Sequence, residues 1–233
     1  NTMARMFGFI GNRADLGARV LEANRSLLKA RRPEGEPLGW GLGFYQSGEV
    51  LLRRRPIDDR AEIDLVEAAE DIRTDVMLGH VRRASVGALR TENTHPFRYR
   101  AWLFAQTGTI VGFERLRARL LESQPEFLRR NVRGETDSEC FFYLFLSFLH
   151  DVGHLDVSYV QGYQVADALR ASILRLVGYR VDVVEFVESA HTPRNTMLRA
   201  TRTGTVEARE EYDALLEQWG VTPKLAELVQ IGG

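Results

Sequence analysis

Short apolar stretches at the beginning of the chain are followed by longer stretches with helical spacing. Residues 5–10 (RMFGFI) are short and apolar enough to form a buried strand. Residues 14–30 place Leu16 and Val20 on one face of an amphipathic helix. The beginning of the chain therefore predicts a strand followed by an amphipathic helix.

A β-hairpin is expected next. Residues 40–46 and 49–53 have strand-like composition, and Ser47 and Gly48 between them suit a tight turn. Further strands are expected at 76–82, 101–105, 180–187 and 195–201. Helices are expected at 61–72, 113–129, 137–151, 160–176 and 206–218, with a short one after Pro223, whereas 33–39 and 86–99 are expected to be loops. Because strands come first, helices follow and strands return, the pattern predicts an α+β fold.

Composition excludes several classes of protein. The chain has 233 residues, 44% of them hydrophobic and 27% charged, and its net charge of -1 does not favour a nucleic-acid partner. It has no run of about 18 apolar residues, and its beginning lacks the pattern of a secretory signal, so we expect neither a membrane span nor secretion. Cys140 is the only cysteine, which excludes an intramolecular disulfide and suits a reducing cytoplasm.

Several polar residues stand at the ends of expected strands or in loops, where functional groups tend to lie. They are Arg82, Asn93, His95, Thr107 and Asp137. Each also has a purely structural explanation. Arg82 can end a surface strand, His95 can shape a turn, and Asp137 can interact with the free N–H groups at the start of a helix.

The same residues fall within an ordered series of motifs. These are MARMFGFIG at 3–11, GWGLGFY at 39–45, GHVRRASVG at 79–87, NTHPF at 93–97, FAQTGTI at 104–110 and GETDSE at 134–139. Their order and spacing resemble the class II glutamine amidotransferases, particularly the small stand-alone members, over about residues 3–177. The resemblance implies an α+β fold of the N-terminal-nucleophile hydrolase type, a four-layer αββα sandwich.

The resemblance also implies a chemistry. Family members attack the side-chain amide of glutamine with an N-terminal cysteine, whose own α-amine acts as the base. An asparagine side chain and a glycine N–H form the oxyanion hole. An arginine binds the α-carboxylate of glutamine, and an aspartate binds its α-amine. We expect no cofactor and no metal.

The part of this pattern that holds the ligand is present. By the resemblance, Arg82 falls on the carboxylate-binding arginine and Asp137 on the amine-binding aspartate. His95 matches the Asn-x-His-Pro segment, and Gly108 falls on the glycine of the oxyanion hole.

The part that reacts is missing. Ala4 stands in place of the nucleophile, Thr107 in place of the oxyanion-hole asparagine, and Gln106 in place of the preceding histidine. The loss of one oxyanion donor costs about 3–4 kcal/mol of transition-state stabilisation in other enzymes. Two other residues are candidates for a substitute nucleophile. Thr2 has a hydroxyl but lies two positions out of register with the match at Arg5, and Cys140 lies in an expected helix, where a small buried cysteine is usual.

Residues 3–178 are expected to form a glutamine amidotransferase type-2-like domain, and residues 179–233 a C-terminal strand and helix extension that can be unrelated to the family. Within the extension, 179–201 is explained by two antiparallel edge strands with a turn at Pro193. The HTPRN run also bears a faint similarity to the closing hairpin of methyltransferases that use S-adenosylmethionine, but no Gly-rich loop for that cofactor precedes it.

The leading hypothesis is a domain that binds glutamine or a γ-glutamyl compound without hydrolysing it, with or without a protein partner and with no nucleic-acid or membrane partner. Two alternatives stay open. One is an active amide hydrolase or amidotransferase whose cysteine has been substituted at position 4, although two losses in one site favour a natural departure from catalysis. The other is a non-catalytic interaction scaffold.

Overall fold

The computed structural model describes residues 5–25, 38–56, 65–83, 88, 90–157, 159–185 and 196–202. The chain forms two compact units, one ending at Tyr143 and the other beginning at Leu144, and each is described by itself. Both units combine helices with antiparallel strands, so the α+β class is confirmed.

The first unit is built on a four-stranded antiparallel sheet. Its strands, in spatial order, are β1 (Arg5–Ile10), β4 (Val76–Arg83), β2 (Leu38–Gln46) and β3 (Glu49–Arg55). The predicted turn between β2 and β3 is confirmed. Ser47 and Gly48 have positive φ angles of 53° and 80°, as a two-residue hairpin turn that follows the twist of its strands requires.

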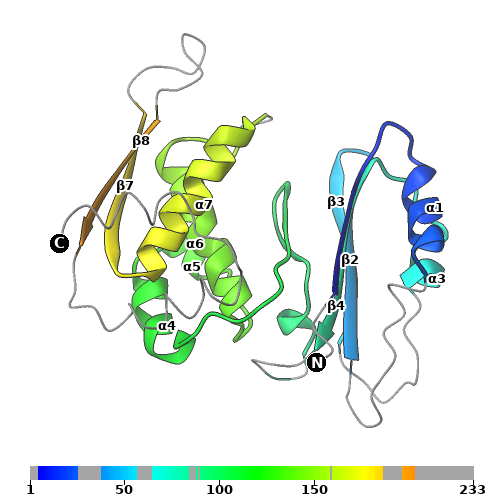
Figure 1. The fold of residues 1–233 in the computed structure, drawn as a ribbon, viewed down its shortest axis with the longest axis horizontal. Helices are drawn as coiled ribbons and strands as arrows, with labels where there is room; N and C mark the ends of the chain where they lie inside the picture. The colour runs from blue at the N-terminus through cyan, green and yellow to red at the C-terminus, as the bar shows by residue number, and fades with distance from the viewer. Residues whose placement is uncertain are drawn as a thin grey trace. The chain divides into compact units, whose positions relative to one another are not determined.

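Helices α1 (Leu16–Ala23) and α3 (Leu65–Ala69) cover one face of this sheet (Figure 1). Side chains alternate between the faces of a strand, so every second residue of β2 and β4 points to these helices. The resulting core consists of Leu21, Leu42, Phe44, Leu65, Ala69, Ile72, Met77 and Val81. Burial in this core explains the spacing of the apolar residues along α1, β2, α3 and β4.

The opposite face of β2 carries Gly41 and Gly43, over which another segment passes closely. A Cβ atom on Gly41 would overlap the backbone carbonyl of His95, and one on Gly43 would lie 2.8 Å from the side chain of Leu103. The hydroxyl of Tyr45, further along β2, donates a 2.6 Å hydrogen bond to the carbonyl of Ala101. Glycines in the GWGLGF motif thus let this segment lie against the sheet.

A short hairpin in this segment was not predicted. Strands β5 (Phe97–Tyr99) and β6 (Trp102–Phe104) pair antiparallel, preceded by a 3-10 turn, η1 (Thr91–Asn93). The expectation of an irregular stretch over 86–99 is therefore wrong at its end. The predicted strand at 101–105 is confirmed as β6.

Among the described residues of this unit, the other helices are α4 (Phe113–Glu122), α5 (Glu126–Arg129) and the beginning of α6 (Asp137–Asp151). The single helix expected over 113–129 is wrong. The helix is interrupted before Pro125, because proline disfavours helical backbone in the residue before it.

Phe142 of α6 stacks on Phe104 of β6, with ring centroids 5.2 Å apart. This contact places the end of the hairpin beside the first turns of α6.

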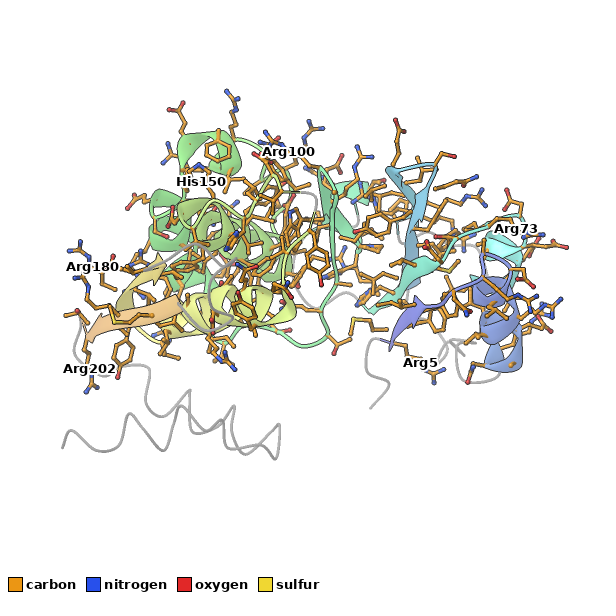
Figure 2. All side chains as sticks on the ribbon, turned by 90° about the horizontal axis from the view of Figure 1, so that it is seen from above. Arg5, Arg73, Arg100, His150, Arg180 and Arg202 are labelled. Carbon is orange, nitrogen blue, oxygen red and sulfur yellow. The ribbon has the colours of Figure 1, made fainter. Side chains whose placement is uncertain are left out.

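In the second unit, α6 is followed by α7 (Gly162–Leu176) and by an antiparallel pair, β7 (Tyr179–Glu185) and β8 (Thr196–Arg202). Helix α7 packs against β7, and the exposed side chains of Arg180 and Arg202 project from the pair (Figure 2). The two antiparallel strands predicted in this part of the chain are confirmed. The expected turn at Pro193 and the helix at 206–218 lie outside the described residues.

Candidate functional site

Strand β4 brings two polar residues of the GHVR motif onto one face of the sheet. His80 and Arg82 are two positions apart, so both point away from α1 and α3. Both side chains are buried, with exposed fractions of 2% and 4%. Burial lowers the pKa of the Arg82 guanidinium, and the nearby charge of Asp137 opposes this. Arg82 and Asp137, 55 positions apart in sequence, therefore interact electrostatically.

His95 reaches the same place from the segment that crosses β2. Its peptide bond to Pro96 is cis. The centroid of its ring lies 4.3 Å from the ring centroid of His80, and the two ring planes are tilted by 34°. Burial lowers the pKa of His80 to about 4 and that of His95 to about 2, and the charge of Arg82 acts in the same direction on both. At neutral pH the two rings are thus an uncharged pair beside Arg82.

Asn93 fixes the loop that carries His95. Its side-chain amide donates to the carbonyl of Ala88 at 2.9 Å, and its amide oxygen accepts from the N–H of Glu135 at 2.8 Å. The side chain is only 1% exposed. The NTHPF and GETDSE motifs are therefore held together by one buried amide.

Asp137 begins α6 and is the residue at which the sequence predicts this helix to start. The hydroxyl of Thr136 accepts from the N–H of Glu139 at 3.2 Å. The carboxylate of Glu139 accepts instead from the N–H groups of Gly134 and Arg133, at 2.6 and 3.1 Å. Asp137 accepts from the N–H of Ser138 at 2.8 Å. The structural explanation of Asp137 as a helix-start residue is thus correct, but it is incomplete.

Asp137 also holds the FAQTGTI loop. Its Oδ2 atom accepts a 2.6 Å hydrogen bond from the N–H of Ile110. In this loop Thr107 and Gly108 are exposed, and Gly108 has a φ of 103°, which favours glycine. The backbone of Gln106 lies near His80 and favours its protonated form. The loop is therefore adjacent to both Asp137 and His80.

Ala4 lies outside the described residues. The first described residue, Arg5, pairs with Val81 at the beginning of β1, next to Arg82 in the sequence of β4. Figure 2 shows the Arg5 side chain at this end of β1. Cys140 is 1% exposed, and burial raises the pKa of its thiol to about 12, so it is a structural cysteine.

His80 is a site residue that was not predicted from the sequence. Its position two residues before Arg82 on a strand was the available signal, because residues at that spacing share a face. No cluster of three or more His, Cys, Asp and Glu side chains within the described ranges is arranged to hold a metal ion.

The chain belongs to the class II glutamine amidotransferases, whose family model matches residues 24–176. It is 32% identical over 162 residues to a probable glutamine amidotransferase, DUG3, of Saccharomyces cerevisiae, covering 67% of this chain and 45% of that protein. It is 30% identical over 112 residues to a putative glutamine amidotransferase, YafJ, of Escherichia coli, covering 45% of this chain and 39% of that protein.

Among solved structures, a glutamine aminotransferase class-II domain protein from Silicibacter pomeroyi is 26% identical, with a TM-score of 0.40, covering 55% of this chain and 53% of that one. The chain thus spans less than half the length of the two curated relatives named above. In the described part of the chain, we find no helix with the length and apolar character needed to cross a membrane.

Proposed function

We propose that this chain binds glutamine, or a compound with a γ-glutamyl group, without hydrolysing it. The observation that carries the proposal is the proximity of Arg82 and Asp137, two charged side chains that are each 4% exposed and interact electrostatically. The ligand carries an α-carboxylate and an α-ammonium group. A guanidinium fork suits the carboxylate, and an aspartate suits the ammonium. The rings of His80 and His95, uncharged at neutral pH, would lie beside this pair without competing for either charge of the ligand.

Two residues argue against turnover. Ala4 has only a methyl group where the family resemblance places the nucleophile, and a methyl group cannot attack an amide. Thr107 takes the position of the oxyanion-hole asparagine, and its hydroxyl is carried on a shorter side chain. Binding can survive these changes because Arg82 and Asp137 are not part of the reacting group.

The finer features of the domain belong to the same proposal. The helix-covered sheet of the first unit suits one half of the αββα sandwich of N-terminal-nucleophile hydrolases. We place the domain at residues 3–178 and treat 179–233 as an extension. We assign the protein to the cytoplasm, which its one cysteine suits.

Thermal unfolding tests the binding proposal. A ligand that binds only the folded state stabilises it by RT ln(1 + [L]/Kd), about 2.7 kcal/mol at a concentration of 100 Kd. Glutamine should therefore raise the Tm of the chain. Arg82→Lys keeps the charge but removes the two-pronged donor, so most of this rise should be lost. Arg19→Lys, on the exposed side of α1, is the control. The proposal is wrong if glutamine leaves the Tm of the folded chain unchanged, or raises that of Arg82→Lys equally.

An active glutamine amide hydrolase with a substituted nucleophile is the second candidate. The feature that favours it is Gly108, which by the family resemblance falls on the glycine whose N–H belongs to the oxyanion hole and which has a φ of 103°. The variant Ala4→Cys, with Asn1 to Met3 removed, should then release ammonia from glutamine. If this variant releases no ammonia, more than one residue of the site has degenerated.

A pure interaction scaffold is the remaining alternative. It predicts that Arg82→Ala changes neither ligand binding nor partner binding.

A further inference from the structure

A polar cavity lies in the first unit, beside the loop that Asn93 holds. Its volume is about 360 Å³, and it is lined by Arg90, Glu92, Asn93, Arg133, Gly134 and Glu135. This size lies at the lower end of the range of small-molecule pockets, about 300–1,000 Å³. Neither Arg82 nor Asp137 lines it, so it is not the site proposed for glutamine.

Buried side chains fix the backbone around this cavity. The amide of Asn93 joins the backbones of Ala88 and Glu135, and the carboxylate of Glu139 holds the N–H groups of Arg133 and Gly134. A Cβ atom on Gly134 would collide with the side-chain oxygens of Asn93 and Glu139. Glycine at this position therefore allows the two loops that form the cavity to meet closely, and the cavity is a built feature of the fold.

The rim of the cavity carries two guanidinium groups, on Arg90 and Arg133, and two carboxylates, on Glu92 and Glu135. Among the ion pairs of the described residues, none joins any two of these four side chains. The Oε2 atom of Glu135 accepts one 3.3 Å hydrogen bond from the N–H of Ala88. The rim is thus neutral overall but presents both signs of charge to a ligand.

We propose that this cavity binds a small zwitterion, a free α-amino acid or the end of a short peptide. Each arginine can hold a carboxylate with two parallel hydrogen bonds, and each glutamate can accept from an ammonium group. A phosphate ion would face the repulsion of Glu92 and Glu135, and a divalent cation that of Arg90 and Arg133. A ligand with one charge of each sign is the class that meets no uncompensated charge here.

The test is a titration of the whole chain with glycine, the smallest such zwitterion, followed by the backbone amide resonances of residues that line each site. Glycine at millimolar concentration should shift the resonances of Gly134 and Glu135 in a saturable way. Arg133→Ala and Arg90→Gln should each abolish that shift. Arg129→Ala, on the exposed side of α5, should leave it unchanged.

Sodium phosphate is the competing probe. If phosphate shifts these two resonances and glycine does not, the cavity is an anion site and the proposal is overturned. It is also overturned if glycine shifts neither resonance in the folded chain. The amide of Ile110, bonded to Asp137, reports separately on glutamine at the first site. Failure of one proposal is therefore distinguishable from failure of the other.

Discussion

The backbone N–H of Ile110 donates a 2.6 Å hydrogen bond to the Oδ2 atom of Asp137. This bond joins the loop that carries Thr107 and Gly108 to the first residue of α6. An ionised carboxylate offers about four acceptor positions, so Asp137 keeps capacity for a ligand ammonium group. One residue thus serves both the proposed ligand site and the position of the neighbouring loop.

Removing the charge of Asp137 should loosen that loop. A hydrogen bond to a charged group contributes about 1.5–3 kcal/mol, against about 1 kcal/mol for a neutral one. In Asp137→Asn the amide hydrogen of Ile110 should therefore exchange with solvent roughly ten times faster, as measured by hydrogen exchange with NMR detection. Ser138→Ala is the matched control, because it removes only a 3.3 Å contact to the same carboxylate. Equal exchange in wild type and Asp137→Asn would show that the bond does not hold the loop.

The two glycines at positions 8 and 41 should respond differently to alanine. A Cβ atom on Gly41 meets the backbone carbonyl of His95, whereas one on Gly8 has nothing within 4 Å. We expect Gly41→Ala to lower the free energy of unfolding by about 1–3 kcal/mol, the usual cost of overpacking, and Gly8→Ala to lower it little if at all. Urea unfolding of both variants checks this. Similar losses in the free energy of unfolding of the two variants would show that the His95 segment does not pass closely over β2.

The buried histidine pair should make the chain sensitive to mild acid. The pKa of His80 is 6.5 in the unfolded chain and about 4 in the folded one, so between these values the unfolded state binds more protons. The free energy of unfolding should have its full value above pH 6.5. It should fall by about 3 kcal/mol from His80 alone as the pH drops towards 4. His95 acts in the same direction.

Urea unfolding at a series of pH values measures this dependence. His80→Gln should give a flatter profile between about pH 6.5 and pH 4.5, although it lowers stability at neutral pH. His150→Gln, which removes an exposed histidine, serves for comparison. An unchanged slope in His80→Gln would mean that His80 is not held uncharged by burial.

Thr107 should limit any restored chemistry. Adding Thr107→Asn to Ala4→Cys, with Asn1 to Met3 removed, supplies the missing amide donor. Ammonia release from glutamine should then exceed that of Ala4→Cys alone by about 10²–10³-fold, the effect of one oxyanion donor elsewhere. Thr109→Asn, in the same loop but outside the family position, controls for a general effect of the substitution. No gain from Thr107→Asn would mean that this residue does not point at the reacting group.

Much of the fold follows from local patterns in the sequence. The short apolar stretch RMFGFI and the Ser47-Gly48 turn predict β1 and the β2–β3 hairpin, and the helix expected from residue 137 is α6. The expectation that β1 is buried is wrong, because it lies at the edge of the sheet and its residues alternate between exposed and half-buried positions. The hairpin of β5 and β6 escapes such patterns. Its strands are three residues long, and its turn uses Arg100 with a φ of 49° instead of glycine or asparagine. Contacts with the sheet and with α6 stabilise it, and these are not visible locally.

The candidate site was predicted residue by residue, but not as an arrangement. Motif spacing singles out Arg82, His95 and Asp137, and strand parity could have added His80. The bond between Ile110 and Asp137, and the cavity between Arg90 and Glu135, depend on loops that meet only after folding. No pattern along one segment encodes such a meeting.

The most direct test of binding without turnover is a calorimetric titration of the folded chain with glutamine, followed by an ammonia determination on the same sample. The account predicts a saturable heat at millimolar glutamine, strongly reduced in Arg82→Lys, and no ammonia above the level in buffer. No heat from a chain shown to be folded would contradict the binding claim. Ammonia released in proportion to the protein concentration would contradict the claim that hydrolysis has been lost.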